Sequence, residues 1–226
     1  MKSKIKSKLP VVVIALFMAV SGTSFSQTSK FSISINSLTT NFNYGKSNSG
    51  FEPYKKNYRG FQAGLSYQAG ITPAFSIVPE IYFAMKGGIL KDKNPLTGSK
   101  TTLRINSLEM PVLARFHINK FYLNAGPYMS YNVGGRVKAE GTSTSSATTT
   151  KVSFGNQPAG FKRWDFGFQA GAGYNFNLKQ SVLTLDVRYG YGLMNISRDV
   201  ERYNRMLNIS LVCSKPQKKM KAEHKG

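Results

Sequence analysis

Cysteine and histidine are scarce in this 226-residue sequence, and each scarcity weighs against a class of function. Cys213 is the only cysteine, so the chain contains no internal disulfide. His117 and His224 are the only histidines, and neither has the spacing of a metal site or a place in a Ser-His-Asp arrangement. We therefore predict no catalytic residue, no metal ligand and no cofactor.

Long apolar runs are also lacking, apart from residues 9–20, which are too few to cross a bilayer as a helix. Lys2, Lys4, Lys6 and Lys8 precede this run, and small residues follow it up to Ser26. This order is typical of a secretory signal peptide. We expect residues 1–26 to be removed, residues 27–214 to fold, and residues 215–226 to form a basic periplasmic tail.

Acidic residues are few, with 10 Asp and Glu against 31 Lys and Arg, for a formal charge of +21. Loss of the four signal-peptide lysines lowers this charge to +17. A strong positive charge favours an anionic partner. Export argues against nucleic acid and favours the phosphates of lipopolysaccharide.

Apolar and polar residues alternate with period two in most of the remaining sequence, which is the pattern of β-strands. The eight predicted strands are residues 31–44, 58–69, 74–86, a fourth ending in 108–116, 121–133, 164–176, 183–193 and 202–213. In the first segment the alternation changes phase near Ser37, which predicts a β-bulge.

Short and long connections alternate between these strands. The short ones are residues 70–73, 117–120 and 177–181, and the long ones are 45–57, 87–101, 134–163 and 194–201. This alternation is typical of outer-membrane barrels, whose short turns are periplasmic and whose long loops lie outside. Eight strands then place both termini in the periplasm. The low-complexity run 141–150 predicts a loop tip.

The two faces of the predicted strands differ in kind. Phe61, Leu65, Phe168 and Leu185 belong to a large apolar face, whereas Gly, Ser, Asn and Gln dominate the other. A sheet in lipid must close so that every backbone group is paired, and the interior of eight strands is filled by side chains. The sequence predicts an all-β fold, an eight-stranded antiparallel up-and-down transmembrane β-barrel without a diffusion pore.

Charged residues on the lumen face predict a buried ionic network, because charges away from water need partners. Its predicted members are Glu80, Lys86, Glu109, Arg115, Asp165, Asp186 and Arg188. A carboxylate pair for hydrolysis or a proton path is the alternative interpretation. Gly167, Gly171 and Gly173 lie in a strand rather than a strand–turn–helix, so we expect them to make room in a narrow barrel instead of binding a nucleotide.

The long loops carry most of the basic residues. We expect Lys55, Lys56, Lys162 and Arg163 to form a collar that binds lipopolysaccharide phosphates. The alternative is a solvated basic surface with no ligand.

Several motifs resemble the PorT-like outer-membrane β-barrel family of bacteria with type IX secretion. They are PEIYFAMKG at 79–87, LEMPVLARF at 108–116, NAGPY at 124–128, DFGFQAGAG at 165–173 and DVRYGYGL at 186–193. The resemblance implies an eight-stranded outer-membrane barrel, and the namesake's role implies a link to protein export. The chain departs from the usual aromatic end of the last strand, with Leu211, Val212 and Cys213 there.

Three functions remain open from the sequence. The first is a non-enzymatic outer-membrane barrel with a structural or accessory role, whose partners are outer-membrane lipid, lipopolysaccharide and envelope or secretion proteins. The second is an outer-membrane enzyme that acts on lipid or peptide, which the scarcity of histidine disfavours. The third is a soluble periplasmic lipocalin-like carrier, which the segregation of short turns from long loops disfavours.

Overall fold

The computed structural model describes residues 29–141, 146–155, 157 and 160–215. The predicted signal peptide and residues 216–226 of the predicted tail lie outside the described residues. The elements are, in order, β1 (Lys30–Asn43), the 3-10 helix η2 (Ser49–Tyr54), β2 (Lys55–Lys56), β3 (Tyr58–Thr72), β4 (Phe75–Leu90), β5 (Thr101–Ile118), β6 (Phe121–Ala139), β7 (Thr148–Lys151), β8 (Trp164–Asn177), β9 (Val182–Gly192) and β10 (Tyr203–Ser214).

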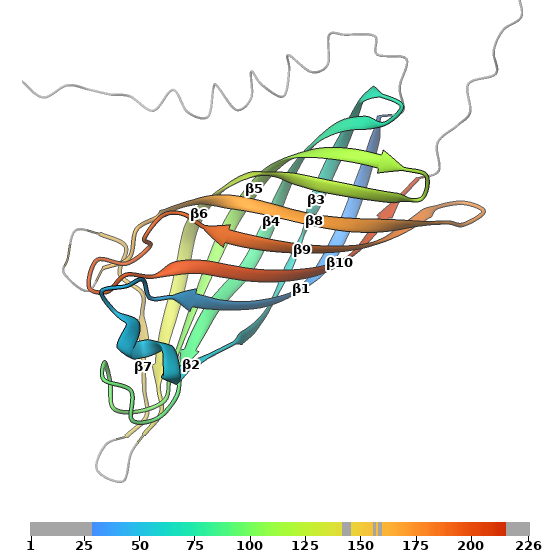
Figure 1. Cartoon of the computed structure of the whole chain (residues 1–226). Coiled ribbons are helices and arrows are strands. Elements are labelled where there is room, and N and C mark those ends of the chain that lie inside the picture. The colour runs from blue at the N-terminus through green and yellow to red at the C-terminus, as the bar shows by residue number, and fades with distance from the viewer. Residues whose placement is uncertain (1–28, 142–145, 156, 158–159, 216–226) are drawn as a thin grey trace, which may run out of the picture.

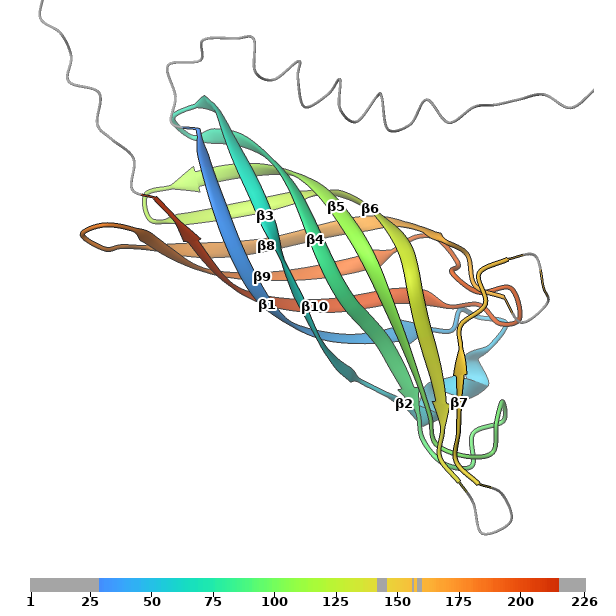
Figure 2. The same cartoon turned by 180° about the vertical axis from the view of Figure 1, so that it is seen from behind.

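Eight of the strands form one closed antiparallel sheet, in the order β1, β3, β4, β5, β6, β8, β9 and β10 (Figures 1 and 2). The barrel closes because β1 pairs with β3 on one side and with β10 on the other. Each barrel strand is a neighbour of the next one along the chain, so the predicted eight-stranded up-and-down fold is confirmed. In the described part of the chain, no helix is long and apolar enough to cross a membrane.

The two ends of the barrel differ in their connections. The short turns and both described ends of the chain lie at one end, where Ser32 is opposite Ser214 (Figure 1). We call it the turn end. Asn119, in the two-residue turn between β5 and β6, has a φ of 57°. The longer connections, with β2, β7 and η2, lie at the opposite end, which we call the loop end.

The outward face of the barrel is apolar. The side chains of Phe61, Leu65, Phe168 and Leu185 are 43%, 52%, 47% and 40% exposed, which confirms that their face points away from the lumen. The polar alternate positions, such as Gln62, are buried inside. A soluble carrier barrel has the reverse arrangement, so this structure argues against the lipocalin-like alternative. An apolar belt of this extent is stable in contact with lipid or detergent but not in contact with water.

The predicted bulge near Ser37 in β1 is wrong. β1 keeps an uninterrupted register with both neighbours through Ser37, and its interior positions continue to alternate. The apolar pattern changes phase because the interior itself becomes apolar at this level, where Leu38 and Phe42 are buried. A register shift does occur in the pairing of β5 with β6, where Val133 has no opposite residue.

Two strands run further than predicted at the loop end. β4 continues to Leu90 and β6 continues to Ala139, so the predicted loops 87–101 and 134–163 are partly sheet, whereas β5 begins at Thr101, within one residue of the end of the predicted loop. The low-complexity run likewise ends in β7, which pairs with β6. The strand segments 87–90, 101–106 and 134–139 form with β2 and β7 a section of sheet that we call the flap (Figure 2).

An apolar core fills the loop end on the inner side of the flap. We call it the loop-end apolar cluster, and its buried members are Phe42, Tyr44, Phe51, Leu90, Leu103, Ile105, Val152, Phe161, Ile196 and Val200. The cluster joins strand ends to three of the long connections, so these connections pack on the barrel. Arg202 supports it, donating to Ser197 Oγ at 2.7 Å and lying 5.3 Å from the centre of the Phe161 ring.

A charge on the outward belt tests this arrangement. Leu185→Arg should destabilise the barrel in liposomes by about 2–4 kcal/mol, because an arginine must then face hydrocarbon. Leu96→Arg is the matched control, since Leu96 is also 40% exposed but lies in the connection between β4 and β5, and it should have little effect. Urea unfolding of both variants, followed by heat-modifiable gel mobility, measures the difference. Equal losses would contradict an outward belt in lipid.

Candidate functional site

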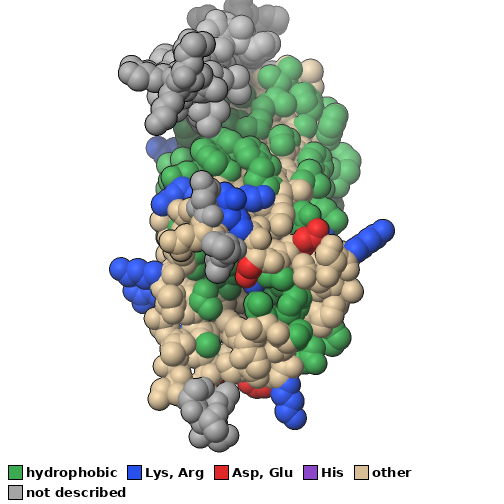
Figure 3. Space-filling model, turned by 90° about the vertical axis from the view of Figure 1, so that its left-hand side faces the viewer, with side chains coloured by type: hydrophobic (Ala, Val, Ile, Leu, Met, Phe, Trp, Pro, Cys, Tyr) green, Lys and Arg blue, Asp and Glu red, His purple; other side chains and the backbone are tan. Residues whose placement is uncertain are grey.

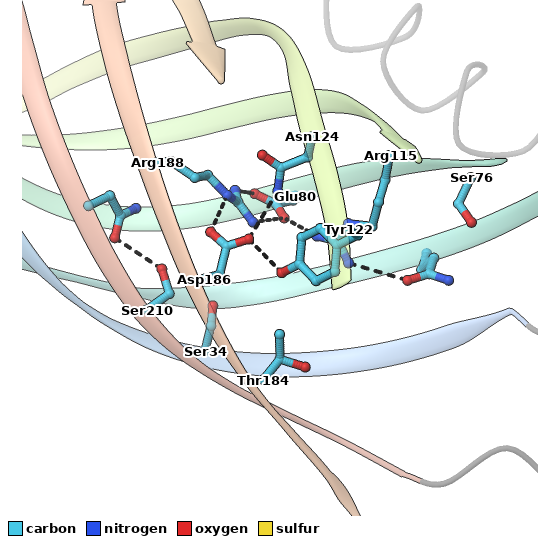
Figure 4. Close-up of polar contacts among 12 residues, drawn as sticks. Ser34, Ser76, Glu80, Arg115, Tyr122, Asn124, Thr184, Asp186, Arg188 and Ser210 are labelled. Carbon is cyan, nitrogen blue, oxygen red and sulfur yellow. Dashed lines mark hydrogen bonds and ion pairs between the residues drawn. The ribbon is translucent and has the colours of Figure 1, made fainter. Parts of the chain in front are cut away.

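The interior of the barrel holds two clusters of charged side chains, and the first lies toward the turn end. We call it the turn-half cluster; its charged members are Glu80, Arg115, Asp186 and Arg188, none more than 8% exposed. They come from β4, β5 and β9, at alternate positions whose side chains all point inward. Figure 4 shows them converging on one another in the lumen.

Arg188 is the centre of the turn-half cluster. Its Nη1 and Nη2 donate to the two carboxylate oxygens of Glu80 at 2.5 and 3.0 Å, a bidentate contact. Its Nε lies 2.6 Å from Asp186 Oδ1. The other oxygen of Asp186 accepts hydrogen bonds from Tyr122 Oη at 2.5 Å and Asn124 Nδ2 at 3.0 Å.

Arg115 is held more loosely in the same cluster. Its Nη2 lies 4.0 Å from Glu80 Oε1, and its Nη1 donates to Gln68 Oε1 at 3.3 Å. Its guanidinium group lies 4.0 Å from the centre of the Tyr122 ring. These longer contacts predict that Arg115 contributes less to the stability of the barrel than Arg188.

The second cluster lies nearer the loop end and contains one cation with two carboxylates. We call it the loop-half cluster. Lys86 Nζ lies 2.8 Å from Glu109 Oε2 and 3.7 Å from Asp165 Oδ2. Hydrogen bonds from neutral donors stabilise the remaining negative charge. Gln169 Nε2 donates to Glu109 at 2.7 Å, and Asn204 Nδ2 donates to Asp165 at 2.7 Å. Burying a carboxylate requires such donors.

Both clusters reach across the lumen. Glu80 is on β4 and Arg188 on β9, and these strands are four places apart in the ring of eight, on opposite walls. In the loop-half cluster, Gln62 Nε2 donates to Glu109 at 3.3 Å while Gln62 Oε1 accepts from Asn208 Nδ2 at 2.8 Å. This chain joins β5 to β10, which are also opposite. Side chains therefore occupy the lumen at two levels.

Glycines in β8 make room for two of the interior tyrosines. A Cβ at Gly173 would lie 2.2 Å from Cζ of Tyr122, and one at Gly167 would lie 2.4 Å from Cε1 of Tyr128. Neither tyrosine ring fits beside a larger residue at these positions. Gly171 has the same role toward Arg188, whose Cγ would lie 2.7 Å from the added atom. These three glycines thus shape the interior, and no strand–turn–helix surrounds them.

The structure gathers the seven predicted network residues into these two groups rather than one. The sequence analysis missed the neutral members, chiefly Gln62, Gln169, Tyr122, Tyr128 and Asn204. Their signal was present, because each occupies an inward position in the period-two alternation of its strand. His117 lies near the end of β5, with Nε2 2.9 Å from Ser76 Oγ. Among the described residues, no group of three or more His, Cys, Asp or Glu is placed to hold a metal ion.

The predicted collar residues are separated into two pairs. Lys55 and Lys56 form β2 and pair with the end of β4, and Lys55 Nζ lies 2.5 Å from Glu52. Lys162 and Arg163 precede β8, which is not a neighbour of β4 in the barrel. Arg163 donates to the carbonyl oxygen of Asn132 at 3.1 Å and lies over two aromatic rings. Lys55 and Arg163 are therefore engaged within the protein.

The sequence profile described as outer membrane protein beta-barrel domain matches residues 24–198. The chain belongs to this family. The closed sheet and its apolar outward belt agree with this family description. The protein is thus an outer-membrane β-barrel. No curated protein sequence matches the chain.

Several solved outer-membrane proteins are similar to the chain at low identity. Neisserial surface protein A is 12% identical with a TM-score of 0.43, and covers 84% of this chain and 99% of its own. Ail of Yersinia pestis, in complex with the heparin analogue sucrose octasulfate, is 13% identical with a TM-score of 0.41, over 84% and 99%. The N-terminal β-barrel domain of Pseudomonas aeruginosa OprF is 11% identical with a TM-score of 0.33, over 83% and 99%. Likeness at this level carries no argument about function.

Removal of one arginine tests the interior network. Arg188→Ala should lower the stability of the barrel by about 3–5 kcal/mol, because Glu80 and Asp186 lose their cation while remaining buried. Arg115→Ala should cost less, since its closest carboxylate oxygen is 4.0 Å away. Lys179→Ala, an exposed turn residue, is the control. The readout is the temperature at which the folded form disappears from a heat-modifiability gel. If all three variants behave like the parent, the network does not stabilise the fold.

Proposed function

We propose that this protein is a non-enzymatic outer-membrane barrel with a structural or accessory role in the cell envelope, and that it does not conduct solutes. The observation that carries this proposal is the bidentate contact between Glu80 and Arg188 across the lumen. The loop-half cluster and the loop-end apolar cluster occupy two further levels of the same interior. Open porins have many more strands and a water-filled lumen, whereas a narrow barrel is filled by its own side chains.

The state of the interior carboxylates supports a role without catalysis. A hydrolase that works with two carboxylates needs both of them open to substrate. Here Glu80, Glu109, Asp165 and Asp186 are each at most 4% exposed and each is bound by cationic or neutral donors of the barrel. We therefore assign them to stability of the fold rather than to hydrolysis or proton transport.

Lipopolysaccharide is the partner that the distribution of charge favours. Four of the ten acidic residues lie inside the barrel, so only six remain for the loops and the tail. The surface therefore keeps few acidic side chains, although Lys86, Arg115 and Arg188 are buried with the four carboxylates. Figure 3, a view onto the loop end, shows Lys and Arg side chains standing out from the rim at several points. Cations at this level are attracted to anionic lipid headgroups, which supports an outward loop end and periplasmic termini.

An accessory role in protein secretion is the finer form of the proposal, and the resemblance to the PorT-like family supports it. A deletion strain tests it directly, by comparing the set of secreted proteins with and without the gene. We expect that the deletion reduces secretion and that the parent chain restores it. An unchanged set of secreted proteins would limit the proposal to a structural role.

Conductance tests the filled interior. The parent protein, folded and incorporated into planar bilayers, should give no stable single-channel openings, and liposomes that contain it should swell in sugar solution no faster than empty ones. The physical reason is that side-chain contacts cross the lumen at two levels. A gel of the same sample confirms that the protein is folded.

A steady conductance from the folded parent would overturn this part of the proposal. Hydrolysis of outer-membrane lipid or of peptide substrates by the pure protein would overturn the non-enzymatic part. The two measurements are independent of each other.

A further inference from the structure

Three cations lie directly opposite one another on the outer face of the flap. In the antiparallel pairings, Arg104 of β5 is opposite Arg136 of β6, and Arg136 is in turn opposite Lys151 of β7. Adjacent strands are about 4.8 Å apart, so this row is only about 10 Å wide. We call it the basic ladder. Like charges in directly opposite positions repel one another and destabilise a sheet.

The side chains of the ladder point outward, because their sequence neighbours point inward. Leu103 and Ile105, on either side of Arg104, are buried in the loop-end apolar cluster. Val137, next to Arg136, packs against the same cluster. Arg136 and Lys151 are exposed and Arg104 is half-buried. The flap therefore has an apolar inner face and a basic outer face.

None of the three ladder side chains has a hydrogen bond or an ion pair within the described part of the chain. No other side chain there neutralises the charge of the ladder. Three acidic residues of the loops are bound to other cations. Glu52 contacts Lys55, Glu140 contacts Lys100, and Asp199 contacts Arg202. Lys138, two residues beyond Arg136 on the same face, is also exposed and adds to the positive charge.

The position of the ladder suits a lipid headgroup. Leu108 and Val133 are the last apolar outward residues before it on β5 and β6, and both are about 40% exposed. Arg104 is four residues beyond Leu108, which is about 13 Å along a strand. The ladder thus lies just past the apolar belt on the loop side, where the headgroups of the outer leaflet begin.

We propose that the basic ladder of Arg104, Arg136 and Lys151 binds the phosphate groups of an outer-leaflet glycolipid, of the lipopolysaccharide type. This inference rests on the proposed outward placement of the loop end and gives it a defined site. Arginine pairs with phosphate oxygens in a bidentate manner, and a bound phosphate removes the repulsion between the three cations. The ladder differs from the collar predicted from the sequence, two of whose members are engaged within the protein.

The test uses the full mature chain, folded in detergent, and bis-phosphorylated lipid A as the probe. The ladder variant is Arg104→Gln/Arg136→Gln/Lys151→Gln. Its control, Lys46→Gln/Lys120→Gln/Lys179→Gln, removes the same charge from exposed positions elsewhere. Lipid A retained through size-exclusion chromatography is measured over a range of salt concentrations. We expect the ladder variant to bind on the order of 100-fold more weakly, and the control to stay within a few-fold of the parent.

Two further samples sharpen the result. Arg104→Lys/Arg136→Lys keeps the charge and should retain most of the binding. Dephosphorylated lipid A should bind poorly to the parent and should not distinguish it from the ladder variant. If the triple variant does not fold, the single variant Arg136→Gln, at the centre of the row, should still weaken binding by roughly five-fold.

The proposal is overturned if the ladder variant binds lipid A as tightly as the parent. It is equally overturned if the control loses as much affinity, or if removal of the phosphates has no effect. Bilayer recordings on the same samples keep this result separate from the proposed function, because a filled lumen remains non-conducting whether or not the ladder binds lipid.

Discussion

Pairing of every backbone group is the constraint on which the rest of this structure depends. A sheet surrounded by hydrocarbon has no water to satisfy its N–H and C=O groups, so an open edge is too costly and the sheet closes. Here β1 pairs with both β3 and β10, and the circle of eight strands has no free edge. Closure then fixes the direction of every side chain, because alternate residues point in and out. The apolar belt and the polar lumen are two consequences of the same ring.

Because the lumen is narrow, the inward polar residues of opposite strands contact one another across it. The Glu80–Arg188 contact and the Glu109–Gln62–Asn208 chain each join opposite walls, and so they connect strands that are not hydrogen-bonded neighbours. Such contacts disfavour slippage of one strand past another, because a shift of one residue would expose these charges to lipid. The glycines of β8 are part of this packing, since Tyr122 and Tyr128 occupy the space that larger residues would fill.

The loop end contains a second, apolar core, and this core accounts for the charge on the outer face of the flap. Apolar residues from the strand ends and the long connections bury one face of the flap. The alternation that places Leu103, Ile105 and Val137 inside places Arg104, Arg136 and Lys138 outside. Burial of the four interior carboxylates leaves few acidic residues to offset this charge. The basic outer face of the flap is therefore tied to the same alternation that builds the barrel.

The sequence by itself determined the all-β class, the number of barrel strands and the face of nearly every residue, because period-two alternation is a local property. It also marked the seven charged lumen residues. It misjudged β1 near Ser37, where the interior changes from polar to apolar without any bulge, and it ended β4 and β6 too early. In both strands two adjacent glycines, Gly87-Gly88 and Gly134-Gly135, interrupt the apolar alternation at the expected end. Only the tertiary structure decided which charges meet, since partners such as Glu80 and Arg188 are 108 residues apart and their contact depends on closure. The same holds for Arg104, Arg136 and Lys151, whose alignment depends on strand register.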